Sequence, residues 1–325
     1  MRTAARLIVS LLCAAAVGCS ARTVRIAPPS AIAAPRVPET IRVQTRDGGR
    51  LVVRRIPLEE YVTATLIAEF DPPSGDPPSV ERMLQLQAII SRTYATANVG
   101  RHERDGFDLC STSHCQIYDP ARLRTSRWAA LAREAAARTR GEVLWYGNGP
   151  ANAVFHADCG GHTSAAADVW GGRPVPYLVG APDDGPARDV HATWRVDLSR
   201  VALRGALDAD PRTAVGGRLD AIDVTRRDAA GRAVSIEIRG ARTVTVRGDV
   251  FREAVTRRLG VSSLRSTLFT VRRTRAGFAF DGRGFGHGVG LCQVGAFARV
   301  RAGASIADVL RHYFPGTVLV GAVSP

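Results

Sequence analysis

The chain contains no lysine, so all 44 of its basic side chains are arginines. This absence excludes catalysis through a lysine Schiff base and phosphate binding by the lysine of a phosphate-binding loop. No segment repeats at a fixed period, which excludes solenoids, and no stretch after residue 20 is long and apolar enough for a transmembrane helix. With 325 residues, 45% of them apolar and 23% charged, the composition is that of a folded globular protein.

The arginine excess gives the chain a formal net charge of +14 at pH 7. The arginines are spread along the sequence instead of forming one block. We interpret the excess as a solvated surface, with binding of a polyanion as the alternative. Charge alone does not decide whether nucleic acid binds, and we expect no nucleic-acid partner.

The first 19 residues have the pattern of a bacterial export signal. Arg2 and Arg6 precede an apolar run at residues 7–17, which is too short to span a bilayer permanently. Small residues then lead to Cys19, as in the cleavage box of a lipoprotein. We therefore expect a lipoprotein signal peptide at residues 1–19, lipidation of Cys19, and an exported protein anchored to a membrane of the cell envelope. An ordinary secretory signal with an incidental cysteine is the alternative.

The rest of the chain divides into a tether and a folded body. Residues 20–40 are rich in proline, alanine and arginine without periodicity, which predicts a flexible tether. Residues 41–325 are predicted to form an α+β body: N-terminal helices packed with an antiparallel sheet, glycine-rich active-site loops, and C-terminal helices. We also consider an inserted β subdomain at about residues 192–283.

The spacing of apolar residues and turn signals predicts the elements of this body. A hairpin is expected over residues 41–53, and a helix from residue 58 to residue 70, which ends before Asp71 and Pro72. Further helices are predicted at about residues 80–99, 121–138, 248–259, 289–301 and 306–313, strands at 143–146, 153–156, 221–225, 234–238 and 242–246, and a hairpin around 270–280.

Several sequence blocks occur in one order and carry a family resemblance. They are residues 58–70, 86–94, 108–118, 156–163, 176–178, 264–269 and 284–296. In this order they resemble the stage II sporulation protein D and amidase-enhancer family, over about residues 41–315. The resemblance implies a peptidoglycan lytic transglycosylase that cuts glycan strands from which an amidase has removed the stem peptides. Peptidoglycan strands and an N-acetylmuramoyl-L-alanine amidase are then the expected partners.

The resemblance places the family's catalytic acid at Glu69. Cleavage of a glycosidic bond at neutral pH needs a carboxyl group that keeps its proton, and an apolar setting such as residues 66–68 and Phe70 raises a carboxyl pKa toward 6 or 7. One carboxyl suffices for a lytic enzyme, because the C6 hydroxyl of muramic acid attacks and the same group serves as acid and then as base. A carboxylate at a helix C-terminus opposes the helix dipole, which argues against a merely decorative role. The family often has Met-Pro after this glutamate, whereas Asp71 and Pro72 follow Phe70 here, which leaves the substrate subsite open.

Four cysteines remain after the signal segment: Cys110, Cys115, Cys159 and Cys292. An even number in an exported protein indicates two disulfides, in one of three connectivities. Cys110, His114 and Cys115 lie within six residues, and some relatives hold zinc at the matching segment, so a zinc site is an equal alternative and free thiols are a third. Cys159 and Cys292 stand in glycine-rich loops, where the family commonly has serine. If these loops meet, the two cysteines bridge or complete a metal site.

Glycines and polar side chains near these blocks are candidates for orienting the glycan. Glycine lets the backbone approach a sugar closely or adopt a positive φ angle. The candidates are Gln116, Tyr118, Gly160, Gly161, His287 and Gln293. Plain turn chemistry for the glycines and a structural hydrogen bond for His287 are the alternatives.

Two other functions compete with the transglycosylase. A cysteine hydrolase would use Cys159 as nucleophile with His156 or His162 as base. A non-catalytic amidase enhancer would hold glycan or recruit an amidase through the same groove. The identity of the partner amidase, the oligomeric state and the physiological process, whether sporulation, division or wall recycling, do not follow from the sequence.

Overall fold

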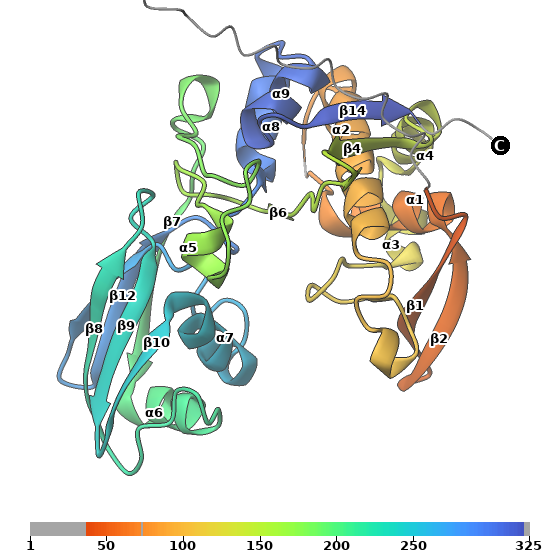
Figure 1. Cartoon of the computed structure of the whole chain (residues 1–325). Coiled ribbons are helices and arrows are strands. Elements are labelled where there is room, and N and C mark those ends of the chain that lie inside the picture. The colour runs from red at the N-terminus through yellow and green to blue at the C-terminus, as the bar shows by residue number, and fades with distance from the viewer. Residues whose placement is uncertain (1–36, 73, 322–325) are drawn as a thin grey trace, which may run out of the picture. The chain divides into compact units, whose positions relative to one another are not determined.

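The computed structural model describes residues 37–72 and 74–321 (Figure 1). The expected signal peptide, the lipidation site Cys19 and the tether up to residue 36 lie outside the described residues. Helices and small, mostly antiparallel sheets follow one another in groups, so the predicted α+β class is confirmed. Within the described ranges, no helix is both long and apolar enough to cross a membrane.

A β-hairpin begins the folded part of the chain. Strands β1 (Thr40–Asp47) and β2 (Arg50–Pro57) pair antiparallel, as predicted. The turn residues Gly48 and Gly49 have φ angles of 53° and 83°, a left-handed conformation that glycine adopts without steric cost. The short strand β3 (Leu109–Cys110) pairs in parallel with β1, and this pairing brings Cys110 to the sheet.

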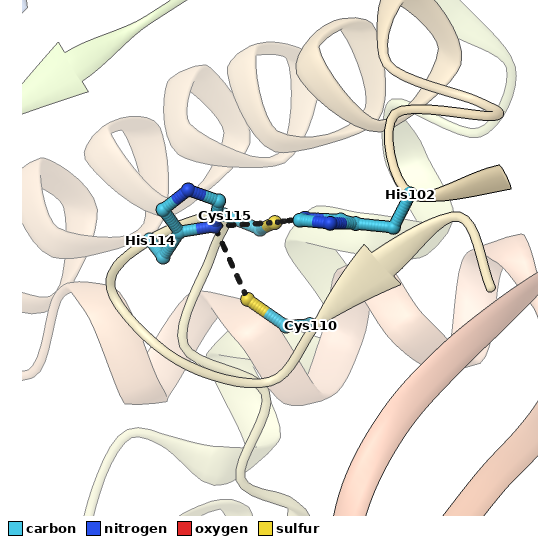
Figure 2. A group of neighbouring side chains, drawn as sticks. All are labelled: His102, Cys110, His114 and Cys115. Atoms are coloured by element: carbon cyan, nitrogen blue, oxygen red, sulfur yellow. Dashed lines mark hydrogen bonds between the residues drawn. The ribbon is translucent and has the colours of Figure 1, made fainter. Parts of the chain in front are cut away.

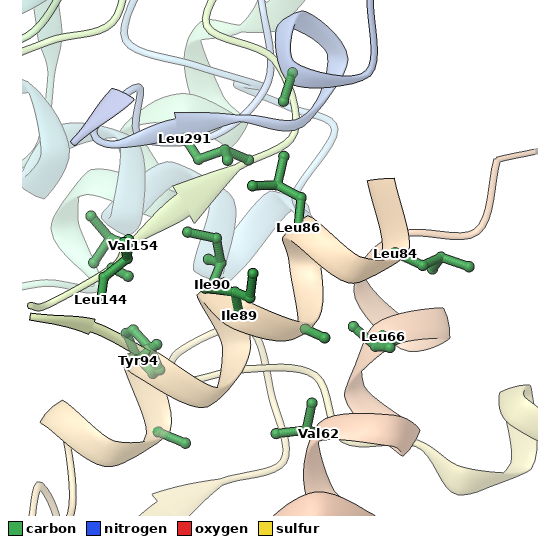
Figure 3. Close-up of a cluster of buried hydrophobic side chains, with 14 of the residues drawn as sticks. Val62, Leu66, Leu84, Leu86, Ile89, Ile90, Tyr94, Leu144, Val154 and Leu291 are labelled. Atoms are coloured by element: carbon green, nitrogen blue, oxygen red, sulfur yellow. The ribbon is translucent and has the colours of Figure 1, made fainter. Parts of the chain in front are cut away.

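Two helices form the centre of the first hydrophobic core. Helix α1 (Leu58–Glu69) ends where Phe70 becomes extended. Helix α2 (Pro77–Ala97) is capped by Asp76, whose side chain accepts a hydrogen bond from a backbone N–H of the first turn. Figure 3 shows both helices packed against later segments through Val62, Leu66, Leu84, Leu86, Ile89, Ile90, Tyr94, Leu144, Val154 and Leu291. Because this core holds the last turns of α1, it also sets the position of Glu69.

The segment predicted as one helix, residues 121–138, is two helices. α3 (Pro120–Thr125) and α4 (Ala129–Arg138) are separated because Ser126 is extended and its hydroxyl donates to the carboxylate of Asp71 over 2.8 Å. This tertiary contact with the loop after α1 outweighs the local helical pattern. The prediction of a single helix is therefore wrong.

The middle and the end of the chain complete the first core. The elements are β4 (Glu142–Tyr146), β5 (Gly149–Pro150), β6 (Phe155–His156), α5 (Ala166–Trp170), β13 (Leu291–Cys292), α8 (Gln293–Arg301), α9 (Ile306–Tyr313) and β14 (Val318–Gly321). β6 and β13 pair in parallel, while β4 pairs with β5 and β14. α8 begins four residues later than predicted, because Gly290 has a φ of 68° and the side chain of Cys292 accepts the N–H of Gly295 at the N-cap. α5 and β14 were not predicted.

A second hydrophobic core lies within residues 194–280. Its elements are β7 (Thr193–Ser199), α6 (Arg200–Asp208), β8 (Leu219–Arg227), β9 (Ala233–Gly240), β10 (Thr243–Arg247), α7 (Gly248–Leu259), β11 (Phe269–Arg273) and β12 (Gly277–Arg283). The strands form two antiparallel sheets, in the orders β10-β9-β8 and β11-β12-β7. The core occupies the range considered for an inserted β subdomain, although the sequence did not predict α6.

We predict that Glu59→Gln destabilises the fold through Arg92. The Arg92 side chain is fully buried and donates to both carboxylate oxygens of Glu59, at 2.8 and 2.7 Å. Neutralising the partner leaves a buried guanidinium without its counter-charge, a change that costs about 3 kcal/mol. Urea unfolding should show this loss, whereas the exposed neighbour Glu60→Gln should stay within about 0.5 kcal/mol of the wild type. Equal stability of the two variants would contradict the assigned role of the pair.

Candidate functional site

The side chain of Glu69 lies at the last residue of α1 and is partly buried. Its Oε1 accepts a hydrogen bond of 2.5 Å from the backbone N–H of Ile117. Burial raises the pKa of Glu69 to about 7, although the Ile117 hydrogen bond and the charge of Arg122 act in the opposite direction. A carboxyl group with this pKa exists in both protonation states near neutral pH and can therefore donate and accept a proton.

The segment after Cys115 supplies two of the predicted binding residues. Gln116 is fully buried, and its Oε1 accepts a hydrogen bond of 3.0 Å from the hydroxyl of Tyr61. The ring of Tyr61 stacks on that of Tyr118 with a centroid distance of 5.4 Å. The amide Nε2 of Gln116 has no hydrogen-bond partner among the described residues. Gln116 and Tyr118 are thus the chain neighbours of Ile117, whose N–H contacts Glu69.

Gln293 approaches Glu69 from the other end of the chain. Its Nε2 donates to the backbone carbonyl of Glu69 and to Oε1 of Gln87, each at 3.2 Å. The two contacts join the first residue of α8 to both α1 and α2. We call Glu69, Gln116, Ile117, Tyr118 and Gln293 the Glu69 site. The sequence did not single out Ile117, because a backbone N–H carries no side-chain signal.

The other predicted binding residues are chain neighbours of residues that contact a buried arginine. Arg232 is 1% exposed and donates to the carbonyl of Cys159 at 2.6 Å. A Cβ atom at Gly288 would lie 2.2 Å from Arg232 Nε, so the backbone beside His287 requires glycine there. In the part of the chain that the structure describes, no hydrogen bond or ring contact joins Gly160, Gly161 or His287 to Glu69.

Four metal-ligand side chains meet beside β3, and we call His102, Cys110, His114 and Cys115 the loop cluster (Figure 2). One ligand atom from each lies within 4.8 Å of the other three. His114 Nδ1 is 3.7 Å from both sulfur atoms, and His102 Nε2 is 3.3 Å from Cys115 Sγ. The structure therefore unites the three predicted ligands and adds His102, which the sequence analysis missed because it stands eight positions before Cys110.

A tight turn lets the neighbouring His114 and Cys115 reach one point. The N–H of Cys115 donates to the carbonyl of Thr112 over 3.0 Å, which folds the chain back between the two cysteines. A hydrogen bond from Cys115 lowers the pKa of the Cys110 thiol to about 4, and the same contact raises the pKa of Cys115. A thiolate is the form that binds a metal ion, so Cys110 is prepared for ligation.

The cysteines in the glycine-rich loops also meet, with the N–H of Cys159 3.2 Å from Cys292 Sγ. All four cysteines of the described chain are free thiols. The Cys159 thiol is fully buried, and its histidine neighbour is His191, at 3.9 Å. Among the described hydrogen bonds, neither His156 nor His162 contacts this thiol; each faces a backbone carbonyl instead. Sequence analysis did not single out His191.

Comparison with known proteins relates the chain to one family. A family model described as Stage II sporulation protein matches residues 46–146, and a domain of unknown function (DUF8618) matches residues 188–290. An uncharacterized protein of Brachyspira hyodysenteriae is 30% identical over 83% of this chain and 68% of its own length. Stage II sporulation protein D of Bacillus subtilis is 28% identical, over 82% of this chain and 75% of its own. The amidase enhancer of Bacillus subtilis is 24% identical over 73% of this chain, which spans only 37% of that protein.

We predict that Glu69→Gln makes the folded state relatively more stable as the pH rises. The folded pKa of about 7 exceeds the ordinary value of 4.5, so the contribution of the protonated form is fully present below pH 4.5 and is lost as the pH rises through 7. The difference in the free energy of unfolding between variant and wild type should therefore shift toward the variant by up to about 3 kcal/mol from pH 4.5 to pH 8. Urea unfolding at both pH values measures this gain, with the exposed Glu60→Gln as the control for charge removal from the same helix. A pH-independent difference would contradict the burial of this carboxyl group.

Proposed function

The chain belongs to the stage II sporulation protein D and amidase-enhancer family, and on that premise we propose that it is a lytic transglycosylase of the bacterial cell envelope. Its substrate would be peptidoglycan glycan strands from which an amidase has removed the stem peptides. The observation that carries the proposal is the pKa of about 7 of Glu69, at the position that the resemblance gives to the catalytic acid. Such a group keeps its proton at neutral pH for half of the time or more.

Glu69 would serve as acid and then as base. Its Oε1 accepts the Ile117 N–H, whereas Oε2 has no hydrogen-bond partner among the described residues, so we assign the transferable proton to Oε2. That proton passes to the glycosidic oxygen as the bond from this oxygen to the muramic acid C1 breaks. The carboxylate then takes the proton of the C6 hydroxyl as this oxygen bonds to C1. The products are a free hydroxyl on one fragment and a 1,6-anhydro end on the other, and no water is consumed.

The neighbours of Glu69 would keep the carboxyl group in place. Ile117 orients one oxygen, and Gln293 holds the backbone carbonyl of the same residue. Tyr118, half-buried and stacked on Tyr61, directly follows Ile117 and offers an aromatic ring for contact with a sugar. The net charge of +14 suits the lactyl carboxylates of muramic acid, so binding should weaken with added salt.

We predict that Glu69→Gln abolishes the release of 1,6-anhydromuramic ends from amidase-stripped strands. Loss of a general acid lowers a rate by about 10² to 10⁴. Mass spectrometry of the released ends measures this loss of rate. In the same assay the wild-type rate should fall as the pH rises above 7, because Glu69 then loses its proton. Glu134→Gln, which removes an exposed carboxylate of α4, is the control and should keep full activity.

The products also separate the competing functions. Plain reducing ends would identify a hydrolase, and a dependence of these ends on Cys159 would identify the cysteine enzyme. Intact strands that sediment with the wild-type protein would identify a non-catalytic binding protein such as an amidase enhancer. Either result would overturn the transglycosylase.

We also propose that the loop cluster holds a zinc ion. Two thiols and two imidazoles form a donor set typical of tetrahedral structural zinc, and their ligand atoms lie within 4.8 Å of one another. When bound, zinc supplies a cross-link between the chain at His102 and the turn at residues 110–115. Cys115 is two positions before Ile117, so this cross-link would hold the N–H that orients Glu69.

We predict that the double variant Cys110→Ser/Cys115→Ser loses one equivalent of zinc and has a lower melting temperature. Its release of anhydro ends should also fall, because Ile117 no longer holds Glu69 firmly. Elemental analysis, thermal unfolding and the strand assay measure the three effects. Ser113→Ala, at an exposed position in the same turn, is the matched control. A cross-linked peptide joining Cys110 to Cys115 after digestion without reductant would show a disulfide instead.

A further inference from the structure

A second group of metal-ligand side chains lies where three separate segments meet. Cys159 follows β6, and Cys292 ends β13, which pairs in parallel with β6. His191 comes from the loop between the short 3₁₀ helix η2 (Gly185–Ala187) and β7. The parallel pairing explains why two cysteines that are 133 positions apart come into contact.

The distances within this group suit one metal ion. One ligand atom from each of Asp158, Cys159, His191 and Cys292 lies within 4.8 Å of the others. Both cysteines and the His191 side chain are fully buried, with 0% exposure. Ligands of a tetrahedral zinc ion, at 2.0 to 2.3 Å from the metal, are separated from one another by about 3.3 to 3.8 Å. The group is therefore close to ligand spacing and closed to solvent.

Two carboxylates flank the imidazole of His191. Asp158 Oδ1 is 2.7 Å from His191 Nδ1, and the Asp158 side chain also accepts two backbone N–H groups, so its oxygens are occupied. On the other side, Asp183 Oδ2 is 3.9 Å from His191 Nε2 and 3.3 Å from Cys159 Sγ, and it accepts a hydrogen bond of 3.0 Å from the hydroxyl of Tyr313. A carboxylate on one ring nitrogen commonly orients a histidine whose other nitrogen binds a metal.

The Nε2 atom of His191 is poorly satisfied without a metal ion. Its hydrogen-bond partner among the described residues is the sulfur of Cys159, 4.0 Å away. A buried polar atom normally has a close partner, because leaving one unpaired costs free energy. A disulfide between the two cysteines would leave this nitrogen as it is, whereas a metal ion would bind it together with both sulfurs.

We propose that Cys159, Asp183, His191 and Cys292, which we call the inner cluster, form a second zinc site with a structural role. Cys159, Cys292 and His191 Nε2 are three ligands, Asp183 Oδ2 is the fourth, and Asp158 orients the imidazole. Two thiolates, one imidazole and one carboxylate are donors that zinc accepts in tetrahedral geometry. Binding releases the protons of the two thiols to solvent. The full burial of the ligands leaves no open position for substrate, so the site is structural.

The charges around the inner cluster also sum to zero with zinc bound to two thiolates. Arg299 donates to Asp183 at 3.0 Å, and the buried Arg232 donates to the carbonyl of Cys159 at 2.6 Å. Arg232 Nε has no partner among the described residues. With zinc bound, the two thiolates and two carboxylates would balance the ion and both guanidinium groups, so that no buried charge is left uncompensated.

The inner cluster also has a structural consequence for the Glu69 site. Cys292 directly precedes Gln293, whose amide donates to the carbonyl of Glu69. A metal ion at Cys292 would thus anchor the start of α8 against the end of α1. Metal binding at the inner cluster does not depend on the proposed activity, and the two can be tested separately.

The test is elemental analysis of the full chain, purified without chelator, alongside two double variants. We expect two zinc equivalents in the wild type, one in Cys159→Ser/Cys292→Ser and one in Cys110→Ser/Cys115→Ser. Each double variant serves as the control for the other. Adding His191→Ala to Cys159→Ser/Cys292→Ser should remove no further zinc, because the inner cluster is already empty in the double variant. Unchanged zinc content in Cys159→Ser/Cys292→Ser would overturn the proposal.

A second measurement on the wild type keeps the proposal testable if the variants do not fold. The native protein is treated with an alkylating reagent, with and without a zinc chelator, and the labelled peptides are identified by mass spectrometry. In the native protein, Cys159 and Cys292 should both be protected from alkylation. After denaturation in chelator without reductant, both should be alkylated. A peptide pair linked through Cys159 and Cys292, or wild-type protein that contains no zinc, would overturn the site.

Discussion

The hydrogen bond from the Ile117 N–H to the carboxyl group of Glu69 is the contact on which the site depends. Burial alone favours the protonated carboxyl group, while this bond stabilises the carboxylate. The two effects together leave the pKa of Glu69 at about 7, so neither protonation state is excluded. The acid and base roles proposed for Glu69 need this balance, which neither burial nor hydrogen bonding produces alone.

Each of the two cysteine clusters is close in the chain to a residue that contacts Glu69. Cys115 of the loop cluster is two positions before Ile117, and Cys292 of the inner cluster directly precedes Gln293. Ile117 contacts the side chain of Glu69, and Gln293 contacts its backbone. A zinc ion bound at either cluster would therefore restrain the end of α1 through these chain connections. Neither cluster takes part directly in the mechanism proposed for Glu69, so this arrangement gives a physical reason for cysteines and histidines in its neighbourhood.

Local patterns predicted the elements well where the hydrophobic core and the pattern agree. α1 and α2 were predicted within three residues at either end, because their apolar faces pack in the first core. The prediction failed where a tertiary contact competes with the local pattern, as at Ser126, whose hydroxyl bonds to Asp71 and interrupts the expected helix. It also failed for α8, where a positive φ at Gly290 and a cap by Cys292 delay the helix.

The sequence by itself determined the family, the α+β class and the list of reactive side chains, because these are properties of residue types and their order. Only the tertiary structure decided which of them meet. His102 joins Cys110 and Cys115 across a turn, and His191 joins Cys159 across 32 positions of chain. The pKa of Glu69 is likewise a tertiary property, since it depends on a neighbour 48 positions away and on the solvent that the fold removes.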